Sequence, residues 1–309
     1  MPADFSAPDG EAYADCVQAS ERVRWRIDDV LPIDRTLDFA LPFLPDSLVH
    51  LATASLPLNH RLTLNHIRAH SYVNLFVFFE EYIVLTAMRH AHAEQFGQPM
   101  ALRALLRFAE EEVKHQQLFR RFKETFRRGF GHDCDVIDNA AEVAGYILTK
   151  SALAVMLVTL HLELITQQHY VSAIKVSPGE LDASFRSLFE AHWLEESQHA
   201  RIDALEIARL SVTSSDADIQ RAFDEYSDIL HNLDQLLLRQ ATLDLDTLER
   251  ITGEPIRDRA MLLTRQHDSY RQDFLHDGFE NQQLVRTMSR LLGDTGAAQL
   301  RALAQKYLT

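Results

Sequence analysis

Apolar residues recur every three or four positions along most of the chain, which is the period of an amphipathic helix. Turn-forming residues interrupt this pattern in only a few places, notably at 96–99, 129–131 and 177–179. Asn59 and Ser151 stand directly before apolar helical patterns and are predicted to cap them. Four long helices are therefore expected, over residues 59–94, 99–128, 151–176 and 180–211.

The two ends of the chain differ from this central part. Residues 28–58 carry four prolines and predict an extended arm that wraps the core, after a short helix over 11–24. Residues 137–150 can form a crossover helix between the second and third long helices. The last third of the chain predicts three or four further helices, with breaks near 243–253 and 293–296. No composition shift marks a linker, so we predict one helical domain in three parts: an N-terminal arm over 1–58, a four-helix bundle over 59–212 and a C-terminal helical extension over 213–309.

The composition agrees with an all-α protein and excludes several function classes. Only 10 Gly and 9 Pro occur in 309 residues, and 46% of the residues are hydrophobic. The net charge of −14 opposes binding to phosphate backbones, so no nucleic acid is expected as a partner. The most apolar stretch, 152–165, is too short to span a bilayer and contains Glu163, so no membrane is expected either. Cys16 and Cys134 lie far apart and the N-terminal segment has no secretory pattern, which together favour a cytoplasmic protein.

Two of the long helices contain the same Glu-x-x-His pattern. Glu112 and His115 form one copy, and Glu196 and His199 form the other. A spacing of three places a carboxylate and an imidazole on one helix face, close enough to hold the same metal ion. A single copy is common on helix surfaces, but two copies on two predicted core helices indicate a metal site.

The other two long helices each place a glutamate inside an apolar segment. Glu80 and Glu163 have no Lys or Arg within four residues, and an uncompensated carboxylate costs several kcal/mol in an apolar bundle. Two divalent cations carry about the same charge as four glutamates, which makes a dinuclear centre close to neutral. This pattern of one Glu from each of two helices and Glu-x-x-His from each of the others is that of ferritin-like dinuclear carboxylate proteins.

The distances from the loops place these acids at one level. Glu80 and Glu112 lie 17 and 15 residues from Gly97, on either side of the first loop. Glu163 and Glu196 lie 15 and 18 residues from the proline of the loop at 177–179. At 1.5 Å per residue, each acid is roughly 25 Å from its loop. The four glutamates can therefore meet in the bundle.

Several neighbouring residues leave alternatives open. On a helical wheel Glu80 points about 40° from the dry centre and Glu81 about 60°, on opposite flanks, which favours Glu80 as the ligand but keeps Glu81 in view. His192 shares a helix face with Glu196 and His199, so it is either a third nitrogen ligand or a core histidine bonded to the backbone. Two further acids, each one residue before a ligand glutamate, either accept the second ring N–H of a ligand histidine across the bundle or are solvated; they are Glu111 and Glu195.

Mixed carboxylate and imidazole ligands without thiolate suit iron or manganese, so two iron ions are expected, with manganese or a mixed Fe/Mn pair as the alternative. Residues 59–205 resemble the non-haem di-iron carboxylate superfamily. His192, placed four residues before Glu196, is similar to the extra histidine ligand of the para-aminobenzoate N-oxygenase group. This resemblance implies seven ligands: Glu80, Glu112, His115, Glu163, His192, Glu196 and His199.

The expected function is that of a di-iron oxygenase that uses dioxygen to oxidise a small organic substrate, by N-oxygenation or hydroxylation, with an external electron donor. One alternative is a desaturase-like oxidase acting on an acyl chain; another is a non-catalytic or ferroxidase ferritin-like protein, and a third is a hydrolase. The residues after Asp216 exceed a minimal bundle, which indicates a substrate pocket or a dimer surface, so a homodimer stays open. Five basic residues near the end of the second helix either complement its dipole or form a docking patch for an acidic carrier protein or an anionic substrate: Arg120, Arg121, Lys123, Arg127 and Arg128.

Overall fold

The computed structural model describes residues 8–49, 56–177 and 179–307, and all of the regular structure in these ranges is helical. The predicted all-α, ferritin-like fold is confirmed. Pro178, the loop proline from which the positions of Glu163 and Glu196 are counted, lies outside the described residues. Residues 50–55 of the predicted arm also lie outside them.

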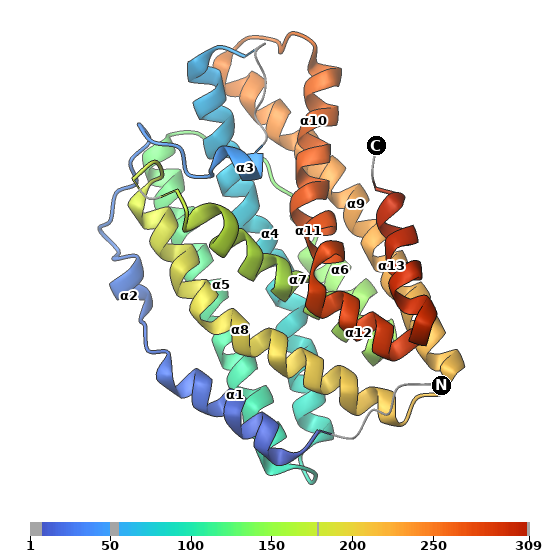
Figure 1. The fold of residues 1–309 in the computed structure, drawn as a ribbon. Helices are drawn as coiled ribbons and strands as arrows, with labels where there is room; N and C mark the ends of the chain where they lie inside the picture. The colour runs from blue at the N-terminus through green and yellow to red at the C-terminus, as the bar shows by residue number, and fades with distance from the viewer. Residues whose placement is uncertain (1–7, 50–55, 178, 308–309) are drawn as a thin grey trace.

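Four long helices form a bundle (Figure 1). Helices α4 and α5 pack along each other as one hairpin, α7 and α8 form a second hairpin, and α5 also contacts α8. A π-helical turn, η1 (Tyr170–Ile174), continues the third of these helices. The bundle helices are α4 (Leu58–Ala93), α5 (Pro99–Phe130), α7 (Ala152–His169) and α8 (Ala183–Val212).

Most of the predicted helix boundaries follow from local chemistry. The Ser151 hydroxyl accepts a hydrogen bond from the backbone N–H of Ala154 and so caps α7 as predicted. Helix α5 ends at Gly131, whose φ of 75° suits glycine. The prediction of Asn59 as a cap was wrong: Pro57 occupies the capping position and Asn59 already lies in the first turn of α4. A proline suits this place because it has no N–H to leave unpaired.

The crossover from α5 to α7 contains less helix than predicted. Only α6 (Ala140–Ile147) is helical within the expected range 137–150. Side chains of neighbouring helices instead hold the backbone before α6: the amide side chain of Gln240 pairs with Ile137 N–H and Asp135 C=O, at 2.9 and 3.2 Å, and Asn74 donates to Ile137 C=O. These hydrogen bonds satisfy the backbone groups that a helix would pair internally. Extended chain rises more per residue than a helix, so it spans the crossover with fewer residues.

The C-terminal extension covers the bundle on the side of α4 and α7. Its first helix, α9 (Asp216–Thr252), ends at the predicted Gly253, but the break predicted to begin at residue 243 starts only there, because the helix is continuous to Thr252. Leu245 and Leu248 are buried there and Asp244 accepts hydrogen bonds from Ser71 and Tyr270, so tertiary contacts override the weak local propensity. The remaining elements are α10 (Arg259–Arg271), η2 (Gln272–His276), α11 (Asp277–Glu280), α12 (Gln282–Leu292), η3 (Gly293–Thr295) and α13 (Gly296–Gln305).

The N-terminal arm lies along α5 and α8 (Figure 1). It contains α1 (Gly10–Arg22) and two single turns, α2 (Ile27–Val30) and α3 (Asp46–Val49). Phe43 is fully buried and its backbone N–H donates to the side chain of Asn65 at 2.8 Å. The arm is therefore part of the core.

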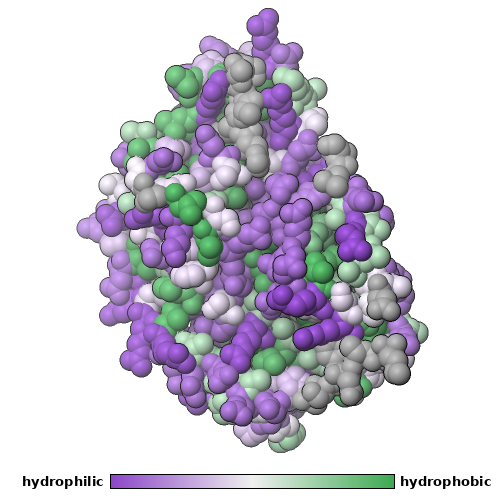
Figure 2. All heavy atoms as spheres, viewed as in Figure 1, coloured by the Kyte–Doolittle hydropathy of each residue, from purple (hydrophilic) through white to green (hydrophobic). Residues whose placement is uncertain are grey.

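Helix α4 is, within the described ranges, the one helix long and apolar enough to cross a membrane by length and composition, with a mean hydropathy of 1.2 in its most apolar window. Of that window, 78% is buried inside the protein, as in the central helix of a bundle. On the face shown in Figure 2, hydrophilic side chains are spread widely, and the apolar ones gather in small separate groups.

Candidate metal centre

The seven side chains predicted as ligands point into the interior of the bundle. None is more than 3% exposed to solvent. Each of the four bundle helices contributes at least one of them, at the level that the loop distances predicted. They are Glu80 on α4, Glu112 and His115 on α5, Glu163 on α7, and His192, Glu196 and His199 on α8.

The two Glu-x-x-His pairs meet face to face. His199 Nδ1 lies 2.8 Å from Glu112 Oε1, and His115 Nδ1 lies 3.3 Å from Glu196 Oε1. One atom from each of the four side chains falls within 4.8 Å of all the others. This set of two imidazoles and two carboxylates can surround one cation.

A second group lies directly beside the first. His192 Nε2 is 3.2 Å from Glu80 Oε1 and 2.9 Å from Glu196 Oε1, and Glu80, His115 and His192 again offer atoms within 4.8 Å of one another. Glu163 lines the same small cavity as Glu80 and His192. The two groups share His115, so they form one continuous cluster of buried donor atoms.

Many of these buried atoms have no hydrogen bond to any described residue. They include both carboxylate oxygens of Glu112, and leaving such groups unpaired in a protein interior costs several kcal/mol. Metal ions would satisfy them, so the residues present fit a dinuclear cation centre. The other unpaired atoms that face the cluster are Glu80 Oε2, Glu163 Oε2, Glu196 Oε1, His115 Nδ1 and His199 Nδ1.

The outward nitrogens of the two motif histidines are held by carboxylates from the opposite helix. His115 Nε2 donates to Glu195 on α8, and His199 Nε2 donates to Glu111 on α5, each at 2.9 Å. This is the crosswise pairing that the sequence predicted as one alternative. When the ring is neutral, this bond places its proton on Nε2 and leaves the lone pair on Nδ1, so the atom that faces the cluster is the one that can bind a cation.

Electrostatics in the cluster depend on burial and on the close approach of like charges. Burial, and then repulsion from Glu112 and Glu196, raises the pKa of Glu80 well above its usual value. Burial, and then repulsion from Glu196, does the same to the pKa of Glu163. For His115, burial favours the neutral ring, but the surrounding carboxylates outweigh it and raise the pKa to about 9. In the absence of cations, protons therefore take up part of the negative charge.

Glu80 and Glu81 lie in different surroundings. The Glu80 carboxylate faces the cluster, whereas the Glu81 side chain is 34% exposed and lies 3.6 Å from Arg120. Glu81 thus pairs at the protein surface, and Glu80 is the residue placed to bind a cation.

The basic residues at the end of α5 are largely used within the protein. Arg121 pairs with Asp28 at 2.9 Å, and Arg128 donates to the carbonyl of Ile33 at 3.0 Å. Lys123 donates to the side chain of Asn74. Two of these contacts hold the N-terminal arm against α5, so these basic residues stabilise the packing of the arm.

Sequence reasoning missed three residues near the centre. Asp203 is fully buried without a hydrogen bond to a described residue, and burial raises its pKa well above the usual value. Its place four residues after His199 continues the spacing of the α8 ligands and was a usable signal. Trp25 stacks on His115 with the ring centres 6.1 Å apart, and Phe274 lines the small cavity from η2. No motif marks either of these two.

Comparison with known proteins gives only distant similarity. No family model and no curated protein matches the chain. A solved R2-like ligand-binding oxidase with aerobically reconstituted Mn/Fe cofactor (long soak) is 14% identical, with a TM-score of 0.46 and coverage of 87% of this chain and 92% of that chain. A variant under the same oxidase name has 14% identity, a TM-score of 0.47 and coverage of 87% and 93%. Because these values are low, the chemistry of this chain has to follow from its own side chains.

Proposed function

We propose that this protein is a dioxygen-dependent oxidoreductase whose centre holds two iron ions, or an iron and a manganese ion, bound by Glu80, Glu112, His115, Glu163, His192, Glu196 and His199. The observation that carries the proposal is the pair of overlapping, buried donor groups, in which many of the atoms that face the cluster have no hydrogen bond to a described residue. Oxygen and nitrogen donors without thiolate suit these metals better than a structural zinc.

A bound pair of reduced ions would supply electrons for the activation of dioxygen. The chain itself supplies the charge balance, through four glutamates, and fixed histidine orientations, through Glu111 and Glu195. Phe76, Ile83 and Phe274 give the small cavity at the centre apolar walls.

We propose further that the reaction is an oxygenation of a small organic molecule. Insertion of one oxygen atom into a C–H or N–H bond consumes one dioxygen, two electrons and two protons and releases one water, so an external reductant is required. An apolar cavity beside the centre favours a protein that acts on an organic substrate. A protein that stores iron needs no such cavity. A carrier-bound acyl chain receives less support, because the basic residues of α5 are largely paired within the protein.

The test is to purify the protein without oxygen, measure its metal content, and record optical spectra after dioxygen is added. We expect two iron ions, or one iron and one manganese, per chain and a transient absorption in the visible range. The variant Glu112→Ala should lose the bound metal and the transient absorption. Glu110 is an exposed neighbour on α5, so Glu110→Gln should behave like the wild type. A single zinc ion per chain with no spectral change would overturn the proposal.

A further inference from the structure

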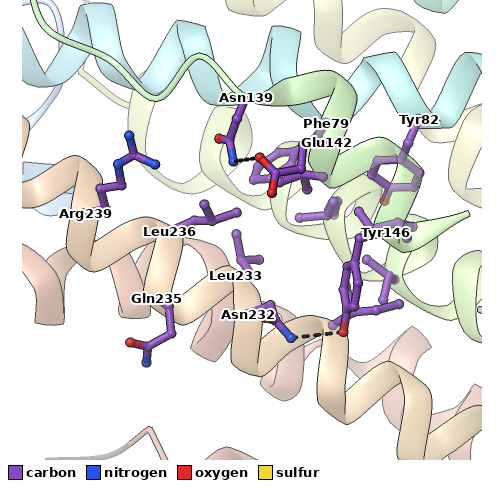
Figure 3. Close-up of a pocket in the computed structure, with 15 residues that line it drawn as sticks. Phe79, Tyr82, Asn139, Glu142, Tyr146, Asn232, Leu233, Gln235, Leu236 and Arg239 are labelled. Atoms are coloured by element: carbon purple, nitrogen blue, oxygen red, sulfur yellow. Dashed lines mark hydrogen bonds between the residues drawn. The ribbon is translucent and has the colours of Figure 1, made fainter. Parts of the chain in front are cut away.

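A cavity of about 390 Å³ lies between α4, α6, α7 and α9, outside the metal centre (Figure 3). Its size falls in the range of pockets that bind small organic molecules, which is about 300–1,000 Å³. Apolar side chains form most of its surface, among them Val143, Val158 and Leu233. The crossover and the C-terminal extension build two of its walls, so a plain four-helix bundle would lack it.

Only one layer of side chains separates this cavity from the metal centre. Phe79 and Leu162 line both the large cavity and the small one that contains the ligand carboxylates. Each of them directly precedes a ligand glutamate, Glu80 or Glu163, in the sequence. A molecule that fills the large cavity therefore touches the residues next to the centre.

Most polar side chains that line the cavity are partly or fully exposed. The exception is Tyr82, whose buried hydroxyl has no hydrogen bond to a described residue. Glu142 accepts a hydrogen bond from Asn139 at 3.2 Å, and Asn232 donates to Tyr146 at 3.0 Å. Arg239 stands at one end of the cavity, apart from Tyr146 at the other. Its exposed guanidinium has no ion pair or hydrogen bond with the rest of the described chain. Arg239 is thus the one cation among the residues that line the cavity. Glu142 keeps its negative charge, because its hydrogen bond comes from a neutral amide.

We propose that this cavity binds an amphipathic organic monoanion. Its apolar body would fill the space between α6 and α9, its carboxylate would pair with Arg239, and its far end would rest against Phe79 and Leu162. The idea that this molecule is the substrate that is oxidised rests on the proposed function. The idea that it binds in the cavity does not rest on it. The cation favours a carboxylate over an alcohol or an amine of the same shape.

The test is calorimetric titration of the full-length, metal-free protein with 6-phenylhexanoate, 6-phenylhexan-1-ol and 6-phenylhexylamine. We expect the carboxylate to bind most tightly. Arg239→Gln should weaken binding of the carboxylate by roughly two- to fivefold and leave binding of the alcohol unchanged, since the guanidinium is exposed. Arg257→Gln, which changes an exposed arginine between α9 and α10, is the matched control and should have no effect.

Two variants test the place of binding. Val143→Trp fills the cavity from α6 and Leu233→Trp fills it from α9, and either should abolish binding of the carboxylate and of the alcohol. Circular dichroism identifies a variant that has failed to fold. The other variant then shows whether the ligand binds in this cavity. Equal affinity for carboxylate and alcohol, no binding of either, or binding that survives a folded cavity-filling variant would overturn the proposal.

A last arm separates this proposal from the proposed function. If the carboxylate binds as expected but leaves the reaction of the iron-loaded protein with dioxygen unchanged, the binding site stands and this class of substrate fails. If the protein does not take up iron or manganese at all, the proposed function fails, and the titration of the metal-free protein still decides the binding site.

Discussion

The imidazole of His115 on α5 donates a hydrogen bond of 2.9 Å to Glu195 on α8, across the bundle. The bond fixes the ring so that Nδ1 faces the cluster, and Lys114 binds the same carboxylate from the outer side. We therefore predict that Glu195→Gln weakens the binding of Mn²⁺ or Fe²⁺ by about 10- to 100-fold, as is usual for such supporting groups. Competition with a chelator measures the affinity under anaerobic conditions.

Glu110→Gln removes a carboxylate at an exposed position of α5 and is the control for this change. Unchanged metal affinity in Glu195→Gln would show that His115 keeps its orientation without Glu195.

Metal binding should also stabilise the fold, because the four glutamates are held close together only in the folded state. A cation at 100 times its dissociation constant adds about 2.7 kcal/mol to the free energy of unfolding. We expect Mn²⁺ to raise the unfolding temperature of the wild type, and a chelator to reverse the rise. In Glu112→Ala the shift should vanish, since Glu112 faces both motif histidines. An equal shift in this variant would contradict the proposed ligand set.

The sequence predicts the bundle well because the information is local. Helix caps, glycine stops and the apolar period act within a few residues, and Ser151 and Gly131 behave accordingly. The level of the four acids also follows from counting, since the rise per residue of a helix is constant. The prediction fails where partners distant in sequence decide: Gln240 holds the extended chain at Ile137, and Ser71 and Tyr270 hold Asp244 within an unbroken helix.

The same distinction applies to the site. Glu80 and Glu163 stand out in sequence because an acid in an apolar helix needs compensation. Trp25 and Phe274 do not, because nothing in their own segments shows that the arm and the C-terminal extension fold back onto the centre. The surplus residues after Asp216 indicate a pocket or a dimer surface, but the place of the large cavity could not be predicted, since it arises only where α6 and α9 meet the bundle.

Phe79 should control access from the large cavity to the centre, and its neighbour provides a matched control. Phe78 and Phe79 are both buried, but only Phe79 lines the two cavities. Truncation of either to alanine should cost about 3 kcal/mol or more of stability. Only Phe79→Ala should change the rate at which dioxygen oxidises the iron-loaded protein, measured by stopped-flow absorbance. The same rate change in both variants would point to general loosening of α4.

Glu206 on α8 should make stability depend on pH. Burial opposes its ionisation, but hydrogen bonds from His90 and Arg209 outweigh burial and bring the pKa to about 2. The pKa of a free glutamate is about 4.3, so the carboxylate stabilises the folded state fully above that value. This stabilisation is lost as the pH falls toward 2. Because Arg209 is partly exposed, we expect about 2 kcal/mol at neutral pH.

Glu206→Gln tests this dependence by urea unfolding at pH 7, 5 and 4, with Glu110→Gln as the control for losing an exposed carboxylate. The variant should have a lower free energy of unfolding than the wild type at pH 7. The difference in the free energy of unfolding should be smaller at pH 4, because there the unfolded wild type begins to bind a proton at Glu206 while the folded wild type does not. A difference that stays constant over this range would mean that the folded and unfolded chains bind this proton equally. The loss in the variant would then come from packing around Tyr13, which donates to the same carboxylate at 2.7 Å, rather than from charge.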